Sequence, residues 1–96
     1  MRIDLDAIKA LLKLDTPIDD ELIERLIQQV TAQAADFMRV ELNVNGDMPE
    51  PVVHAVEMMV TYLYERRDNL KKDEYEVQVR AFEALLYPHR DLEKFF

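Results

Sequence analysis

The chain has 96 residues, of which 49% are hydrophobic and 33% are charged, and its formal net charge is −8. This length fits a single domain, and no run approaches the roughly 20 apolar residues that a membrane-spanning helix needs. Because 20 acidic residues outnumber 12 Lys and Arg residues, the surface repels phosphates, which excludes a conventional DNA-binding protein. The chain contains no cysteine, which agrees with a cytoplasmic protein, and its acidic first residues lack the pattern of a secretion signal.

The single glycine of the chain favours helices joined by short loops over sheets with tight hairpins. We expect a first helix that is capped by Asp4 and carries four apolar residues on one side: Leu5, Ile8, Leu11 and Leu12. A second helix is predicted from about residue 20 to about residue 41, with an apolar residue at every fourth position: Leu22, Leu26, Val30, Ala34 and Met38. The intervening Asp15, Asp19 and Asp20 lack the glycine turn and closing glutamate of a calcium loop, so we interpret them as helix caps.

The third predicted helix begins at Pro51, after the loop that holds Gly46, and continues to about Asp68. Its polar residues form one narrow stripe: His54, Glu57, Thr61, Glu65 and Asp68. The remaining residues from 52 to 64 are apolar, so this helix is either the centre of a small bundle or partly covered by another subunit. Because a domain of this size offers few neighbouring helices, we expect the chain to self-associate.

Residues 74–79 fit two structures. Apolar and polar residues alternate there as in a strand, whereas Tyr75, Val79, Phe82 and Leu86 have the spacing of one helical face. Periodicity does not decide between the two, and we expect a short extended piece that enters a helix near Val79.

The last helix should end at Tyr87, because Pro88 disfavours helical geometry in the residue before it. The predicted fold is therefore all-α: a small bundle of about four helices with a short extended segment before the last helix. We divide the chain into a helical domain, residues 1–88, and a C-terminal tail, residues 89–96. Seven residues are expected to be largely buried: Leu26, Val30, Val56, Val60, Leu63, Leu85 and Leu86.

The sequence offers no catalytic, metal-binding or cofactor-binding motif, so we predict that the protein is not an enzyme. The two histidines, His54 and His89, lack the spacing of metal ligands. Four cations form the one basic cluster: Arg66, Arg67, Lys71 and Lys72. Helix-end charge explains the cluster, and a contact with an acidic partner or a DNA backbone is the alternative.

Four segments, taken in order, resemble a known family. They are "LDAIKALLKLD", the acidic break followed by "DDELIERLIQQVTAQAADFM", then "TYLYERRD", and finally "ALLYPHR". The same order is typical of the tailed-phage head-tail connector family, small helical head-completion or adaptor proteins of the lambdoid siphophage type. The chain departs from the family pattern at His89, where an aromatic residue is usual, and at "VRAFEALL", where a proline-glycine turn is often found.

The resemblance implies a structural protein that assembles as a ring beneath the portal, bridges it to the tail or stopper, and leaves a channel for DNA. Its partners would be copies of itself, the portal protein and the next connector, stopper or tail protein, with DNA passing through without tight binding. The expected location is the virion head-tail junction, with host cytoplasm as the site of assembly. We predict a subunit or partner interface of nine residues: Met58, Met59, Tyr62, Arg66, Arg67, Arg90, Leu92, Phe95 and Phe96.

Two other functions compete with this one. The overall charge fits a small acidic regulator or DNA mimic that binds a basic partner, whereas a helix-turn-helix DNA binder would need a basic helix that the sequence lacks. The tail also has two interpretations, since Leu92, Phe95 and Phe96 have the spacing of one amphipathic turn. It either folds back on its own domain or docks on a neighbouring protein and orders as it binds.

Overall fold

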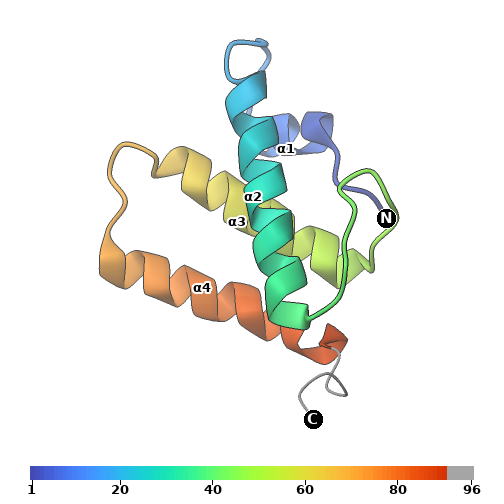
Figure 1. Cartoon of the computed structure of the whole chain (residues 1–96). Helices are drawn as coiled ribbons and strands as arrows, with labels where there is room; N and C mark the ends of the chain where they lie inside the picture. The colour runs from blue at the N-terminus through green and yellow to red at the C-terminus, as the bar shows by residue number, and fades with distance from the viewer. Residues whose placement is uncertain (91–96) are drawn as a thin grey trace.

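The computed structural model of the chain describes residues 1–90 and contains four α-helices (Figure 1). Their bounds are α1, Leu5–Leu11; α2, Asp20–Met38; α3, Glu50–Glu65; and α4, Lys72–Leu86, which runs into the short 3-10 helix η1, Tyr87–His89. Residues 1–90 include no strand. The all-α prediction is therefore confirmed.

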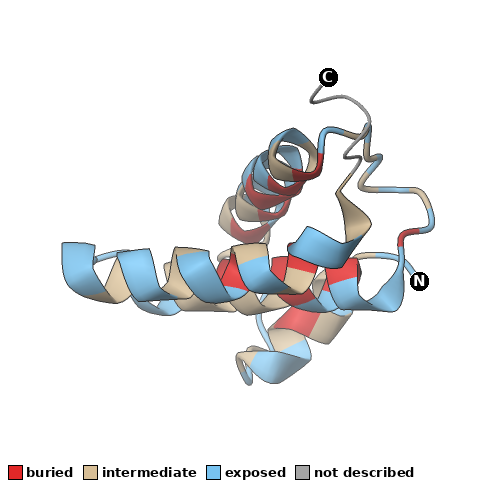
Figure 2. Ribbon diagram, turned by 90° about the horizontal axis from the view of Figure 1, so that it is seen from below, coloured by how far each residue is buried: buried red, intermediate tan, exposed pale blue. Residues whose placement is uncertain are grey.

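Helix α3 is the central element of the bundle. It packs against α2, α4 and α1, while α2 crosses in front of both α3 and α4 (Figure 1). Seen from below, α2 lies above the α3–α4 pair and the short α1 lies below it (Figure 2). Seven of the 16 residues of α3 are buried within their own chain, so most of its wide apolar arc needs no second subunit to cover it.

The core is built mainly from one side of α2 and the facing side of α3. Four of the seven residues expected in the core are fully buried: Val30, Val56, Val60 and Leu86. The other three, Leu26, Leu63 and Leu85, are only partly buried and pack against the core. On α1, the expectation that Leu11 lies on the buried side is wrong. Its side chain is 61% exposed, and Ile8 is the buried residue of that helix.

The expectation of an extended piece at residues 74–79 is wrong, because α4 begins at Lys72 and is continuous to Leu86. Phe82 and Leu86 are buried, and Val79 packs against the core, so the helical spacing follows the face that α3 and α2 cover. Val77 is 58% exposed, which shows that its part in the strand-like alternation is incidental.

Helix ends follow the local signals only in part. Asp4 caps α1 as predicted, its side chain accepting a hydrogen bond from the backbone N–H of Asp6. Asp19 precedes α2 but makes no capping hydrogen bond. Its carboxylate instead accepts a hydrogen bond from the Tyr64 hydroxyl near the end of α3. This contact ties the start of α2 to the end of α3.

Two left-handed residues end the first two helices. Lys13 follows α1 with φ 58, and Arg39 follows α2 with φ 59, a region that glycine usually occupies after helices. Helix α2 therefore ends at Met38 rather than near residue 41, and α3 ends at Glu65 rather than near Asp68.

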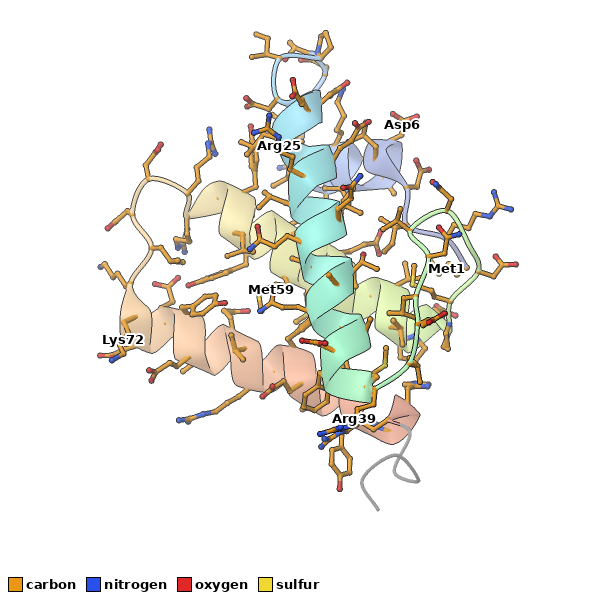
Figure 3. The ribbon with its side chains drawn as sticks, viewed as in Figure 1. Met1, Asp6, Arg25, Arg39, Met59 and Lys72 are labelled. Atoms are coloured by element: carbon orange, nitrogen blue, oxygen red, sulfur yellow. The ribbon has the colours of Figure 1, made fainter. Side chains whose placement is uncertain are left out.

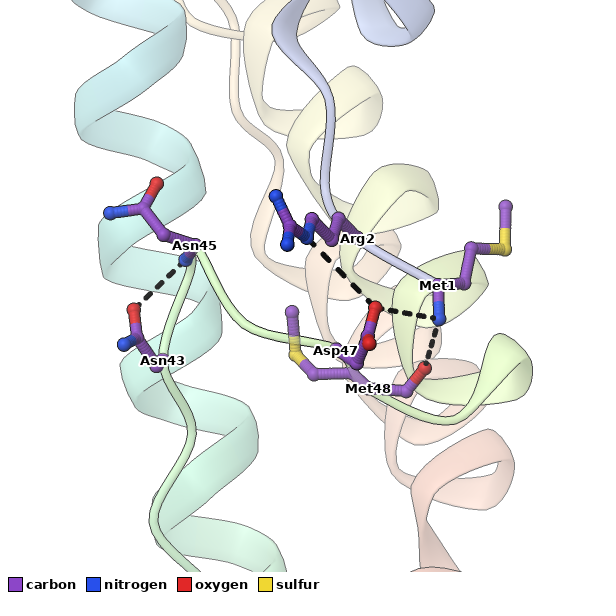
Figure 4. Close-up of polar contacts among 6 residues, drawn as sticks. All are labelled: Met1, Arg2, Asn43, Asn45, Asp47 and Met48. Carbon is purple, nitrogen blue, oxygen red and sulfur yellow. Dashed lines mark hydrogen bonds and ion pairs between the residues drawn. The ribbon is translucent and has the colours of Figure 1, made fainter.

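The N-terminus is held against the loop between α2 and α3. The Met1 amine donates a hydrogen bond of 3.0 Å to the Met48 carbonyl (Figure 4). The Met48 N–H donates one of 2.8 Å to the Met1 carbonyl. Asp47 lies 3.6 Å from the same amine and 3.9 Å from Arg2. This pairing buries Met48, which is 4% exposed.

Candidate partner-binding surface

The side of α3 that faces away from α2 carries a shallow groove. Two adjoining hollows of about 270 and 340 Å³ share His54. Helix α3 contributes Glu50, His54, Glu57, Met58, Thr61 and Glu65 to their lining. Leu11 of α1 and Leu85 of α4 form the apolar walls. We call this surface the α3 groove; its floor is the polar stripe that the sequence predicts.

The α3 groove is acidic. Glu50, Glu57 and Glu65 line it, and among residues 1–90 His54 is the only one with a basic side chain in its lining. Burial raises the pKa of Glu57 above its ordinary value, His54 opposes this rise, and Asp4 adds to it. The negative charge of Glu57 is therefore held in surroundings that disfavour it, so an approaching cation would be stabilising.

The turn between α3 and α4, together with the first residue of α4, carries the basic cluster in residues 66–72. Arg66 donates a hydrogen bond of 2.7 Å to Glu74, an interaction that raises the pKa of Arg66. Arg67 stacks on the Tyr64 ring at 4.1 Å and donates to the Tyr64 carbonyl. Both arginines are thus occupied within their own chain. We call residues 66–72 the basic turn.

The free cations of the basic turn are its lysines. Within residues 1–90, neither Lys71 nor Lys72 has a recorded ion pair, and both are exposed. Figure 3 shows Lys72 at the far end of the α3–α4 hairpin, pointing away from the body of the protein. Between the arginines and the lysines, Leu70 is 50% exposed. The basic turn therefore presents a leucine between two arginines and two lysines, with the exposed Asp68 and Asn69 on its arginine side.

The predicted interface residues occupy different parts of the molecule. Met58 lies in the α3 groove, whereas Met59 is 3% exposed and belongs to the core of its own chain. Tyr62 is half-buried beside the basic turn, with the Arg66 guanidinium 6.0 Å from its ring centre. Burial, followed by the nearby Glu74, raises the pKa of Tyr62. Arg66 and Arg67 lie in the basic turn itself.

Arg90 lies at the opposite end of α2 from the Tyr64–Asp19 contact. Its guanidinium is 4.5 Å from the centre of the Phe37 ring and 5.7 Å from that of Tyr87. The chain is thus held against the last turn of α2 up to this residue. The three remaining predicted interface residues, Leu92, Phe95 and Phe96, lie outside the described residues.

Sequence reasoning missed the walls of the α3 groove. It placed Leu11 on the buried side of the first helix and Leu85 in the core, and it assigned Glu50 no role. The available signal was the length of the first apolar segment, since a helix of seven residues is too short to cover a neighbour of 16 residues.

No group of side chains suited to holding a metal ion occurs among residues 1–90. Over the same residues, every helix falls short of the length and apolar character needed to cross a membrane.

A search against models of protein families matches residues 2–90 to the family described as Phage gp6-like head-tail connector protein. Searches of curated proteins and of solved structures found no match. Because the family match covers nearly the whole chain, the protein belongs to the phage gp6-like head-tail connector family. This family is structural rather than enzymatic, and membership implies association with other phage head and tail proteins in the virion.

Proposed function

We propose that the protein assembles as a ring beneath the portal, bridges the portal to the tail or stopper, and leaves a channel for DNA. The observation that carries this proposal is the family match over residues 2–90. The fold supports it, because α3 keeps one face open along its length while the opposite face is buried in the core. A ring requires such an unoccupied surface on every subunit.

The net charge of −8 suits a channel that DNA crosses without being held. Like charges oppose a close approach to the phosphates, and the basic turn holds the cation cluster that the sequence shows. We expect no measurable affinity for duplex DNA near physiological salt. A fluorescence anisotropy titration that gave micromolar binding with a steep salt dependence would contradict this and would place the basic turn on the DNA.

The C-terminal tail extends the proposal. Of this tail, residues 89–96, the structure places Arg90 on the Phe37 ring beside the end of α2. We propose that the tail docks on the portal, on the next connector protein or on the adjacent subunit, with Leu92, Phe95 and Phe96 as its apolar contacts. Burying two phenylalanines would contribute a few kcal/mol to such a contact, by the usual value for large apolar side chains.

The experiment is to delete the gene from the phage or prophage that encodes it and to supply the protein from a plasmid. Loss of the protein should leave heads without tails in electron micrographs, and the wild-type chain should restore complete virions. A variant lacking residues 91–96 should fold but fail to restore them. Normal virions in the absence of the protein would refute the connector function and favour the acidic regulator.

A further inference from the structure

The basic turn and the α3 groove have complementary chemistry. The basic turn presents Leu70 between pairs of cations, and the α3 groove presents Leu11 and Leu85 as apolar walls along a line of glutamates. We propose that the basic turn of one copy docks in the α3 groove of the next copy. This contact would join subunits head to tail, and the inference rests on the ring assembly proposed above.

Each partner in this contact has groups that its own chain leaves unsatisfied. Lys71 and Lys72 have no recorded ion pair within residues 1–90, and Leu70 is 50% exposed. In the α3 groove, Leu11 is 61% exposed, and Glu57 carries its charge in a partly desolvated place. Docking would cover both leucines with apolar side chains and would pair the lysines with the glutamates.

The basic turn adjoins one end of the α3 groove, at Glu65, so a second copy would enter the groove from its other end. Helix α3 has 16 residues, so at 1.5 Å per residue its ends are about 22 Å apart. The basic turn follows the last residue of α3, whereas Glu50, His54 and Leu85 line the other end of the α3 groove. A protruding turn and a separate receiving groove form a heterologous contact, which closes into a ring when the rotation between subunits allows it.

A second copy explains these features better than DNA does. DNA would satisfy the lysines but would leave the α3 groove and its exposed leucine uncovered, because acidic side chains repel phosphates. The chain itself supplies a cluster of cations around an apolar residue, which is the chemistry that the groove requires.

The test uses two charge-reversal variants of the full chain. The turn variant carries K71E and K72E, and the groove variant carries E50K and E57K. The turn variant should fold normally, because acidic residues at the start of α4 favour the helix dipole. A control with R2E and R80E has the same net charge as the turn variant and alters two exposed cations elsewhere. Melting curves monitored by circular dichroism verify that all variants are folded.

Self-association is measured by sedimentation velocity at low salt over a range of protein concentrations. Each charge-reversal variant alone should associate at least about tenfold more weakly than the wild type and the control, because like charges then face each other. An equimolar mixture of the two variants should associate again, since the acidic turn of one matches the basic groove of the other.

Three results would overturn the inference. The first is unchanged association of either folded variant, and the second is a mixture that associates no better than its components. The third is a wild-type chain that stays monomeric at every concentration tested although it restores complete virions. In that last case the connector function stands, and only the contact between copies is refuted.

Discussion

The two faces of α3 differ in almost every physical respect. The buried face is apolar and closed: Val52, Val56 and Val60 are fully buried, and α3 packs on α2, a helix of 19 residues. The opposite face is polar and open: His54 and Glu65 are exposed, and the seven-residue α1 and the end of α4 flank it. One helix thus separates two tasks, since one face stabilises the fold and the other remains available to a partner.

Helix α2 is also fastened at both ends, which α1 is not. At its start, Asp19 accepts a hydrogen bond from Tyr64, and near its end Phe37 stacks on Arg90. Helix α1 has one ion pair with α2, in which Lys9 lies 2.8 Å from Asp20. The difference teaches that helix length and end contacts, rather than overall hydrophobicity, decide which surface of a small bundle stays free.

The largest expected difference in stability is between an aspartate placed on the buried face of α3 and one placed on its open face. V56D places an unpaired charge in the core, which costs several kcal/mol, about the whole stability of a small domain. M58D places the same residue in the half-open groove and should cost about 1 kcal/mol or less. Thermal melts followed by circular dichroism measure both. Equal losses would mean that the two faces do not differ as described.

A smaller effect concerns the fastening at the start of α2. Y64F removes the hydroxyl that binds Asp19 and should cost about 1.5–3 kcal/mol, the range for a hydrogen bond to a charged group. Y62F is the matched control: the Tyr62 hydroxyl is buried without a hydrogen-bond partner in the described part of the chain, so its removal should not destabilise the protein. Urea unfolding of both variants provides the comparison.

The same contact predicts a dependence on pH. The hydrogen bond to Asp19, then burial, raise the pKa of Tyr64 above its ordinary value. The native state therefore holds the Tyr64 proton more tightly than the unfolded state, so its contribution is complete below about pH 10 and is lost as pH rises further. Y64F should abolish that part of the alkaline loss. If wild type and Y64F lose stability in parallel above pH 10, this contact does not cause the loss.

The fastening near the end of α2 should have an effect of about 1 kcal/mol. R90A removes the stacking on Phe37, for which cation–π contacts give about 0.5–2 kcal/mol depending on burial. Removal of residues 91–96 should leave the melting temperature unchanged, because the proposed tail contacts are with other proteins. If this truncation lowers the melting temperature as much as R90A does, the tail stabilises its own domain and the docking proposal fails.

The smallest expected effect lies on the open face. E57Q removes a charge whose pKa is raised mainly by burial, so it should stabilise the protein at pH 7 by at most about 0.5 kcal/mol after allowance for exposure. Because the native state favours protonated Glu57, the gain should vanish below about pH 4, where the carboxyl is neutral in both states. E50Q, at the start of α3, should have the opposite sign because it removes a favourable interaction with the helix dipole.

Local signals in the sequence predicted the all-α fold and marked several helix ends. Asp4 marks the start of α1, Pro51 lies in the first turn of α3, and Pro88 lies within the short 3-10 helix that follows α4. The same signals failed at residues 74–79, where two periods fit equally well. Val79 and Phe82 pack on the core, and this packing favours the helix at residues 74–79. Such tertiary contacts cannot be read from the local sequence.

The sequence predicted which residues the candidate surface contains on α3 and in the basic turn, but not the shape of the groove. The polar stripe on α3 and the basic cluster were both visible in the sequence, but the walls of the groove come from α1 and α4, and their positions depend on the fold. The Tyr64–Asp19 contact joins residues 45 positions apart, and no local pattern marks it. Caps and helical faces are short-range properties, whereas grooves and end contacts require the assembled bundle.

The left-handed residues Lys13 and Arg39 carry a further consequence. A side chain in this region costs about 1–2 kcal/mol relative to a right-handed conformation, and such strain persists only where the surrounding structure imposes it. Leu14 follows Lys13 and Val40 follows Arg39; both pack against the core and so hold the backbone in these conformations. Loosening of the core would therefore release backbone strain at both helix ends, so fraying of these ends and loss of core packing should occur together.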